Sequence, residues 1–300
     1  MYRITVPATT ANLGPGYDVL GMALSQYSVF ECELSDEIVI ELDGLEKEKL
    51  TIENNLVINC MNKLFEKIGK YPSGYHIKIT NGVPLARGMG SSATAIIGGL
   101  LSANALMDFP LSKDEILELA TEIEGHPDNV APALLGNLIV STKIDNGEIV
   151  YKSITPFDEL MCVLFIPDYE ISTSSSRSVV PKSFEIRDAV HNMSHLTLMI
   201  MGFMTGDTNI ISKTMNDVIH EPYRKSLILG FDELKKSALD AGAFGFALSG
   251  AGSTVIAFCD KADAERVSES LQETRNMLGI AGKVKKIEPC RNGATCEKIN

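Results

Sequence analysis

A glycine-rich segment that runs directly into a helix constrains this chain more than any other feature. The segment is PLARGMGSSAT, Pro84–Thr94. Gly88 and Gly90 allow positive φ angles and let a ligand come close to the backbone, and the small and apolar residues of 91–107 predict a long helix. The first N–H groups of a helix have no partner within it, and its dipole favours negative charge. The segment therefore predicts a phosphate-binding site at a helix N-terminus.

The loop by itself leaves its chemistry partly open. The GxxxxGK[ST] pattern of a Walker A loop is absent, and so is the third glycine of a dinucleotide-binding fingerprint. The hydroxyl groups of Ser91 and Ser92 can donate to phosphate or coordinate Mg²⁺. A tight turn capped by a serine remains the alternative interpretation of the same residues.

Length and charge limit the classes of protein that remain. The chain has 300 residues, more than one domain usually contains, so we expect two domains that share a cleft. It carries 27 lysines and arginines against 39 aspartates and glutamates, a formal net charge of −12. This acidic balance argues against nucleic-acid binding, which needs clustered positive charge. It leaves room for an anionic ligand, because one pocket can be positive on an acidic protein.

The cysteines and the apolar runs favour the cytoplasm. Six cysteines occur without a CxxC pair, which is typical of a reducing compartment. Cys32, Cys162 and Cys259 lie in apolar, strand-like runs, so we expect small buried side chains there. The start, MYRITVPATTANL, lacks the features of a signal peptide. No run of about 18 apolar residues predicts a membrane span.

Apolar periodicity and turn residues divide the chain into strands and helices. Strands are predicted at 2–6, 30–34, 37–42, 75–79, 160–166, 244–249, 253–259 and 283–287. Helices are predicted at 55–68, 91–107, 113–124, 129–135, 187–204, 210–219, 227–241 and 262–278. The polar segment STSSSRS, 172–178, is expected to be a loop, and a domain boundary is placed near 152–156. The second half is therefore an α+β unit with antiparallel strands.

Two further motifs combine glycines with polar residues. PATTANLGPGYDVLGMAL, Pro7–Leu24, follows the first strand, and its glycines leave Asn12 and Asp18 as the polar groups that can face a cleft. LSGAGST, Leu248–Thr254, lies between two predicted strands, and its glycines also suit a close backbone approach. Either motif alone is more often a simple turn.

The three glycine-rich motifs, in this order, resemble those of the GHMP kinase superfamily, and the resemblance covers nearly the whole chain. PATTANLGPGYDVLG and EGHPDNVAPALLG, residues 124–136, are most similar to members that phosphorylate the side-chain hydroxyl of L-homoserine in threonine biosynthesis. The resemblance implies an α+β, two-domain fold. Its N-terminal domain, 1–155, would be ribosomal-protein-S5-like and its C-terminal domain, 156–300, ferredoxin-like, with ATP in the cleft between them.

The resemblance also implies roles for individual residues. The ATP triphosphate would be held by Pro84, Leu85, Ala86, Arg87, Gly88, Met89, Gly90, Ser91, Ser92, Ala93 and Thr94. Mg²⁺ would be held by Ser91 or Ser92 with Glu124, for which Glu122 is a competitor because the spacing to the following histidine is short. The substrate would contact Asn12, Asp18, His126, Asn129, Thr173, Arg177 and Arg224. Residues 250–252 would close over the phosphates.

The chemistry of an amino-acid substrate agrees with these residue types. The ammonium group of homoserine needs a carboxylate, which Asp18 supplies. Its carboxylate suits the planar donor fork of an arginine, which Arg177 and Arg224 supply. A sugar would instead call for several side chains that accept from hydroxyls. The rival functions are a GHMP kinase for another alcohol and a non-catalytic ligand sensor on the same fold. A homodimer is the assembly that the family suggests.

No general base is evident among the predicted catalytic residues Asn129, His126 and Arg177. Asn129 stands where other members of the superfamily carry a catalytic aspartate, and an asparagine cannot take up the proton. Asp128 and His126 remain alternatives as the base. Phosphoryl transfer has a loose transition state, so alignment and charge neutralisation can supply most of the rate enhancement. We therefore expect the hydroxyl proton to pass to the phosphate itself.

Overall fold

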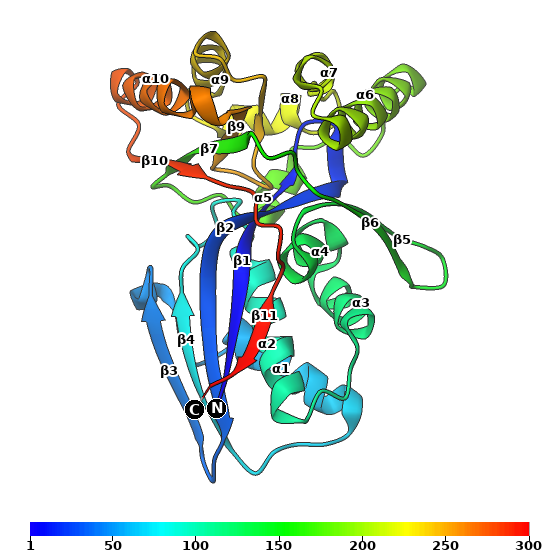
Figure 1. The fold of residues 1–300 in the computed structure, drawn as a ribbon, viewed down its shortest axis with the longest axis vertical. Helices are drawn as coiled ribbons and strands as arrows, with labels where there is room; N and C mark the ends of the chain where they lie inside the picture. Colours follow the sequence, from blue (N-terminus) through cyan, green and yellow to red (C-terminus); the bar gives the residue numbers. More distant parts are fainter. Residues whose placement is uncertain (300) are drawn as a thin grey trace.

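The computed structural model describes residues 1–299 and places two sheets one above the other along the long axis of the molecule (Figure 1). The larger sheet has the strand order β11-β1-β2-β4-β3, and β5 joins it through β2 and carries β6 at its other edge. Its strands are β1 (Tyr2–Asn12), β2 (Gly16–Leu34), β3 (Ile38–Gly44), β4 (Tyr75–Asn81), β5 (Leu138–Lys143), β6 (Ile149–Ile154) and β11 (Thr295–Lys298).

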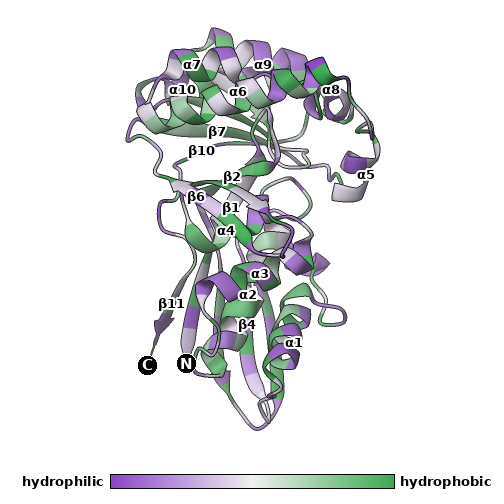
Figure 2. Ribbon diagram, turned by 90° about the vertical axis from the view of Figure 1, so that its right-hand side faces the viewer, coloured by the Kyte–Doolittle hydropathy of each residue, from purple (hydrophilic) through white to green (hydrophobic). Residues whose placement is uncertain are grey.

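Four helices cover one face of the larger sheet. They are α1 (Leu56–Ile68), α2 (Ser91–Leu106), α3 (Lys113–Glu124) and α4 (Pro127–Leu135). Helix α2 lies against the sheet, and Figure 2 shows its largely hydrophobic colour there. A Cβ added to Gly98 would overlap the ring of Phe30 on β2. Glycine at this position therefore lets the helix approach the strands closely, which sets the distance between the helix and the sheet.

The smaller sheet has the order β10-β7-β9-β8 and is antiparallel throughout. Its strands are β7 (Leu160–Pro167), β8 (Gly245–Leu248), β9 (Val255–Asp260) and β10 (Gly282–Ile287). On β7, Val163 and Phe165 belong to one apolar cluster, and Cys162 and Leu164 to another. Burial of both faces explains why this strand is a continuous apolar run.

Helices pack on both faces of the smaller sheet. The cluster of Val163 and Phe165 includes side chains of α9 (Phe231–Asp240) and α10 (Ala264–Met277). The cluster of Cys162 and Leu164 includes side chains of α6 (Ile186–Thr205), α7 (Thr208–Thr214) and also β2. This second cluster therefore joins the two sheets. The short helix α5 (Thr173–Ser178) lies between them, and α8 (Glu221–Arg224) lies beside α7 and α9 (Figure 1).

Most predicted elements are confirmed, and the differences have physical causes. The helix at 113–124 has the predicted ends, and Ser112 forms a capping box with Glu115. The loop predicted at 172–178 is wrong, because the Ser172 side chain accepts from Ser175 N and starts α5. The helix predicted at 210–219 ends at Thr214, because the chain turns around Asp217. Strands β5, β6 and β11 and helix α8 were not predicted.

The chain passes from the larger to the smaller sheet between β6 and β7, where the boundary at 155 and 156 was placed. That division stays a prediction, and we propose it with one change, which assigns β11 to the N-terminal domain. Strand β11 returns to the larger sheet, where Tyr2 pairs with Lys298 and Thr5 with Thr295. The two ends of the chain consequently lie side by side (Figure 1).

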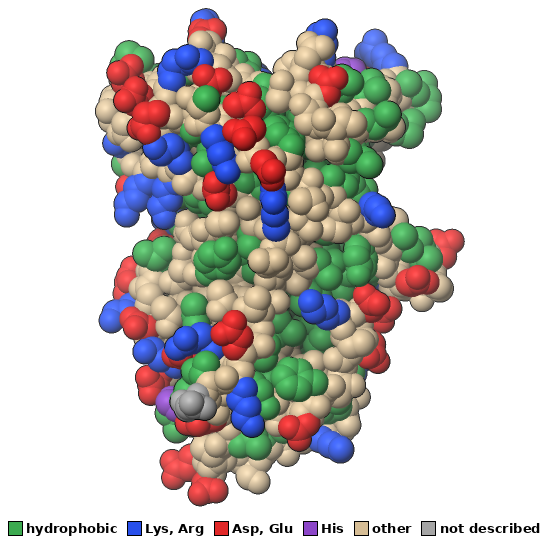
Figure 3. Space-filling model, viewed as in Figure 1, with side chains coloured by type: hydrophobic (Ala, Val, Ile, Leu, Met, Phe, Trp, Pro, Cys, Tyr) green, Lys and Arg blue, Asp and Glu red, His purple; other side chains and the backbone are tan. Residues whose placement is uncertain are grey.

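The surface and the cysteines agree with the composition. On the face drawn in Figure 3, basic side chains are scattered among acidic ones. Cys32, Cys162 and Cys259 are buried as predicted, and none of the six cysteines forms a disulfide. Within residues 1–299 no helix combines the length and the apolar character that crossing a membrane requires.

Candidate active site

A cavity of about 460 Å³ lies where the three glycine-rich motifs meet, between the two sheets. Most of the predicted site residues line it: Asn12, Asp18, Leu85, Ala86, Gly88, Gly90, Ser91, Ser92, Thr94, Glu124, His126, Asn129, Thr173, Arg177 and Arg224. Four residues of the predicted phosphate loop are absent from its lining: Pro84, Arg87, Met89 and Ala93. Residues more than 200 positions apart in sequence thus share one cavity.

Glycines bring the motifs into direct contact. Gly88 and Gly90 have φ angles of 72° and 69°, and Gly90 is the N-cap of α2. A Cβ on Gly88 would overlap the backbone oxygen of Ser249, and one on Gly90 would overlap the side chain of Thr9. The loop before α2 therefore touches the first motif on one side and the third motif on the other. The first residues of α2, Ser91 and Ser92, line the cavity.

Arg87 anchors the loop instead of facing the cavity. Its side chain is buried and donates from Nε to Pro167 O at 2.9 Å and from Nη2 to Asp168 O at 2.8 Å. Its Nη1 lies 2.9 Å from Glu46 Oε1, and Glu46 also accepts from Leu85 N at 2.8 Å. The guanidinium thus ties the loop to the end of β7.

Ser92, near the end of the glycine-rich loop, is paired with Glu124 at the end of α3. Ser92 Oγ donates to Glu124 Oε2 at 2.7 Å. Burial raises the pKa of Glu124, against the opposing effect of the Ser92 hydrogen bond. Glu122, the competing residue, is exposed and does not line the cavity. Carboxylate and hydroxyl oxygens are the donors that Mg²⁺ prefers, so Ser92 and Glu124 fit a magnesium site.

The other end of the cavity contains a carboxylate and two arginines. Asp18 accepts from Arg177 through both oxygens, at 2.7 Å and 2.9 Å. The Asn12 amide holds this end in place, since it accepts from Asp18 N at 3.0 Å and donates to Gly250 O at 2.8 Å. The hydrogen bond with Asp18 raises the pKa of Arg177, which opposes the effect of its burial.

Arg224 is a buried guanidinium without a carboxylate. It is 2% exposed, and within residues 1–299 no Asp or Glu lies within ion-pair distance of it. It donates instead to neutral oxygens, from Nε to Ser176 O at 3.1 Å and from Nη2 to the Tyr17 hydroxyl at 3.2 Å. Burial lowers the pKa of Arg224. The cavity therefore holds a cation that lacks an anionic partner.

Tyr17 is a site residue that the motifs did not single out. Its hydroxyl accepts from Arg177 Nη1 at 3.0 Å as well as from Arg224, and its ring centroid lies 4.7 Å from the Arg224 guanidinium carbon. Burial raises the pKa of Tyr17, which keeps it a neutral phenol. Its place between Gly16 and Asp18, in the first motif, is the signal that could have identified it.

The start of α4 supplies the remaining polar groups. His126 Nδ1 contacts the buried Asp128 carboxylate. Burial alone would lower the pKa of His126, but the hydrogen bond and charge of Asp128 outweigh it, and the pKa is raised. Asn129 Oδ1 accepts from Thr9 Oγ1 at 2.8 Å, and its Nδ2 lies 3.4 Å from Asp128 Oδ1. Thr173 lines the cavity from α5.

Comparisons with known proteins agree over the whole chain. Residues 55–137 match the family described as GHMP kinases N terminal domain, and residues 199–276 match GHMP kinases C terminal. A homoserine kinase from Microchaete diplosiphon is 42% identical over 297 residues, which cover 97% of this chain and 96% of that protein. One from Carboxydothermus hydrogenoformans is also 42% identical, with 98% and 96% covered.

Solved structures show the same similarity in three dimensions. The crystal structure of homoserine kinase from Cytophaga hutchinsonii has a TM-score of 0.88 and 28% identity, and the match covers 98% of this chain and 96% of that one. The Methanococcus jannaschii mevalonate kinase has a TM-score of 0.70 and 18% identity, with 96% and 98% covered. The second similarity concerns the fold alone.

Proposed function

This chain belongs to the GHMP kinases, and we infer from that premise that it transfers the γ-phosphate of ATP to the side-chain hydroxyl of L-homoserine, giving O-phospho-L-homoserine. It is an ATP-dependent kinase with an alcohol as acceptor. The observation that carries the choice of acceptor is the buried guanidinium of Arg224, which has no carboxylate partner within residues 1–299. A substrate carboxylate supplies that partner, and the neighbouring Asp18 suits the ammonium group of the same molecule.

Substrate binding is an exchange of ionic partners. Asp18 and Arg177 neutralise each other in the absence of substrate. When homoserine enters, its ammonium group takes the place of the guanidinium at Asp18, and its carboxylate takes the place of Asp18 at Arg177. Every charge remains paired, and Arg224 gains the partner that it lacked. An alcohol without both charged groups would leave part of this set unpaired, which is costly in a buried site.

The remaining parts of the cavity suit a nucleotide. The N–H groups at the start of α2 and the backbone of the Gly88–Gly90 turn would donate to the phosphates. Phe30, Leu56 and Ile79 also line the cavity, and their apolar side chains suit a purine base. Mg²⁺, held by Ser92 or Ser91 with Glu124, would supply positive charge to the phosphate oxygens.

The environment of α4 supports catalysis without a general base. Asn129 Oδ1 already accepts from Thr9, and the Asp128 carboxylate is engaged with His126. The raised pKa of His126 favours its protonated form, which cannot accept another proton. As the substrate oxygen bonds to phosphorus and the bond to ADP breaks, the hydroxyl proton passes to a phosphoryl oxygen. The protein contributes alignment and donors to the developing charge.

Product identification with purified protein tests this function. ADP release is measured with Mg-ATP and one acceptor at a time, namely L-homoserine, mevalonate and galactose, with ATP alone as the control. The expected result is ADP and O-phosphohomoserine, seen by phosphorus NMR, in equal amounts with homoserine only. Turnover of mevalonate or galactose instead would overturn the acceptor. Tight binding of homoserine without ADP release would favour a ligand sensor.

Two further properties stay predictions. The unpaired cysteines support our proposal that the enzyme works in a reducing compartment such as the cytoplasm. A homodimer is the assembly expected from the family, and light scattering of the purified protein measures it.

A further inference from the structure

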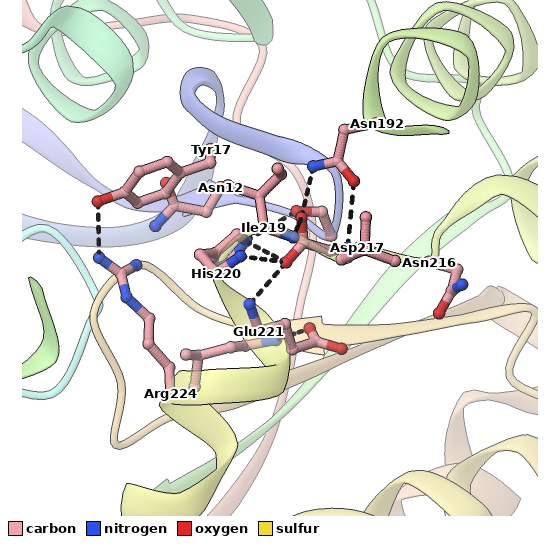
Figure 4. Close-up of polar contacts among 12 residues, drawn as sticks. Asn12, Tyr17, Asn192, Asn216, Asp217, Ile219, His220, Glu221 and Arg224 are labelled. Atoms are coloured by element: carbon pink, nitrogen blue, oxygen red, sulfur yellow. Dashed lines mark hydrogen bonds and ion pairs between the residues drawn. The ribbon is translucent and has the colours of Figure 1, made fainter. Parts of the chain in front are cut away.

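A buried carboxylate lies between α7 and α8 and takes no part in the chemistry described above. Asp217 is 4% exposed and accepts four hydrogen bonds (Figure 4). Its Oδ2 accepts from His220 N at 2.7 Å and Glu221 N at 2.6 Å. Its Oδ1 accepts from Ile219 N at 3.1 Å and Asn192 Nδ2 at 2.6 Å. All four donors are neutral. Three of them are the backbone N–H groups of residues 219–221, so the carboxylate organises the backbone of one short turn.

This carboxylate has no cationic side chain to stabilise it. Within residues 1–299 no Lys or Arg lies within ion-pair distance of Asp217. His220 Nε2 is 3.6 Å away, but burial lowers the pKa of His220, which favours the neutral ring. A buried charge is costly unless hydrogen bonds satisfy it. Its four N–H donors therefore specify one conformation of the turn 217–221 more strictly than a neutral side chain would.

The turn leads directly to Arg224. Helix α8 begins at Glu221 and ends at Arg224, and a helix of one turn does not hold its own conformation. The side chain of Glu221 accepts from Leu248 N at 3.1 Å, which ties α8 to the strand before the third glycine-rich motif. Asp217 fixes the start of this helix, and Arg224 lies at its other end, inside the cavity.

A second connection runs through the aromatic rings. The ring of His220 stacks on Tyr17, with centroids 5.0 Å apart and an interplanar angle of 19°. His220 Nε2 also contacts Gly14 O at 2.8 Å. Tyr17 in turn accepts from Arg224 through its hydroxyl and faces the guanidinium with its ring. Figure 4 shows Asp217, His220, Tyr17 and Arg224 arranged in this sequence.

We propose that Asp217 is a positioning residue for Arg224, which fixes the turn before α8 and thereby holds the guanidinium where it meets the carboxylate of the amino-acid substrate. The inference rests on the proposed function. It assigns Asp217 no contact with substrate. It predicts that the residue controls recognition of the substrate carboxylate and leaves nucleotide binding unaffected.

The substitution Asp217→Asn tests this in the full chain, because the amide has nearly the same shape but cannot accept at its nitrogen. The expected result is a rise of about tenfold in KM for homoserine, the effect of losing a hydrogen bond to a charged group, with kcat and KM for Mg-ATP little changed. The matched control is Asp207→Asn. Asp207 caps α7 by accepting from Ile210 N at 3.0 Å, away from the cavity, and its substitution should leave KM for homoserine unchanged.

A double-mutant cycle separates positioning from a general structural role. If Asp217 acts through Arg224, Asp217→Asn lowers kcat/KM for homoserine in the wild-type background but not in the Arg224→Met background. An equal factor in both backgrounds, or an equal rise of KM for Mg-ATP, overturns the inference. If Asp217→Asn does not fold, Asn192→Ala removes one of the four donors and should show the same loss of effect in the Arg224→Met background.

The outcomes for function and for positioning are distinct. If the wild type turns over homoserine and Asp217→Asn has the same KM, the inference fails and the proposed function stands. If the wild type forms no ADP with homoserine, the proposed function fails and the inference fails with it.

Discussion

Replacing Arg224 by methionine should separate the stability of this protein from its function. Methionine keeps much of the length and apolar stem of the side chain and removes the charge. Because the guanidinium is 2% exposed and has no carboxylate partner within residues 1–299, its charge adds little to folding stability. The same charge should be decisive for binding a substrate carboxylate. We therefore expect a small change in the free energy of unfolding and a large change in KM for homoserine.

The two magnitudes follow from the contacts. The variant loses hydrogen bonds to Ser176 O at 3.1 Å, the Tyr17 hydroxyl at 3.2 Å and Gly250 O at 3.4 Å, each worth about 1.5 kcal/mol net because the donor is charged. It also loses the contact with the Tyr17 ring, worth about 2 kcal/mol when desolvated. In return, the variant no longer has the desolvation penalty of a buried unpaired ion, which is on the order of several kcal/mol. These contributions nearly cancel, so we expect the free energy of unfolding to change by about 1 kcal/mol or less.

Substrate binding has no such compensation. Truncating one partner of a buried charge pair costs about 2–5 kcal/mol, so KM for homoserine should rise by about 100-fold or more while KM for Mg-ATP stays constant. A coupled ADP assay measures the kinetic constants, and urea unfolding measures the stability.

The matched control is Arg3→Met. Arg3 pairs with Glu31 through two nitrogens, at 3.0 Å and 2.7 Å, but on the exposed surface, so its loss should change neither quantity much. A fall of several kcal/mol in the free energy of unfolding for Arg224→Met, with KM for homoserine unchanged, would show that Arg224 is structural.

Three further substitutions test other parts of the site. Because burial raises the pKa of Glu124, KM for Mg-ATP should rise as pH falls toward that raised pKa. Glu124→Gln should raise KM by at least about tenfold and remove this acidic limb, whereas a limb that persists would assign it to another group. Gly98→Ala would place a Cβ on the Phe30 ring, so overpacking of about 1–3 kcal/mol should outweigh a gain of about 1 kcal/mol in helix propensity. Urea unfolding that shows a more stable protein would refute this. Asn129→Asp adds a carboxylate beside Asp128, and its negative charge would repel both that carboxylate and the phosphates of ATP. We therefore expect kcat to fall, and a rise by orders of magnitude would show that a missing base limits turnover.

Local sequence rules apply to the nucleotide end of the site, whereas most residues of the substrate end were predicted from the family resemblance. Gly88, Gly90 and the helix after them are contiguous, and local rules on glycine and helix termini apply to them directly. Arg87 illustrates the limit of those rules. It lies inside the loop, but its partners Pro167 and Asp168 are 80 and 81 residues away, so no local pattern could place it. The same holds for the pair of Asp18 and Arg177, which are 159 residues apart.

The elements that the sequence did not predict have weak patterns. Strand β6 buries only its first and last residues, Ile149 and Ile154, and therefore shows no alternation. Helix α5 contains serines and no apolar repeat, and a hydrogen bond to the Ser172 side chain starts it. Pairing with β5 determines β6, whereas a local cap determines the start of α5.

The return of β11 to the larger sheet has a mechanical consequence. The backbone crosses between the sheets twice, once after Ile154 and once after Ile287, and the second crossing is fastened by bonds from Ser25 N to Glu288 O and from Cys290 N to Ala23 O. The two crossings act together with the apolar cluster of Cys162 and Leu164, which β2 shares, and with the bond from Gly250 N to Ala11 O. The two sheets are therefore braced against both twisting and separation, so the three glycine-rich motifs should keep their spacing while ligands enter and leave the cavity.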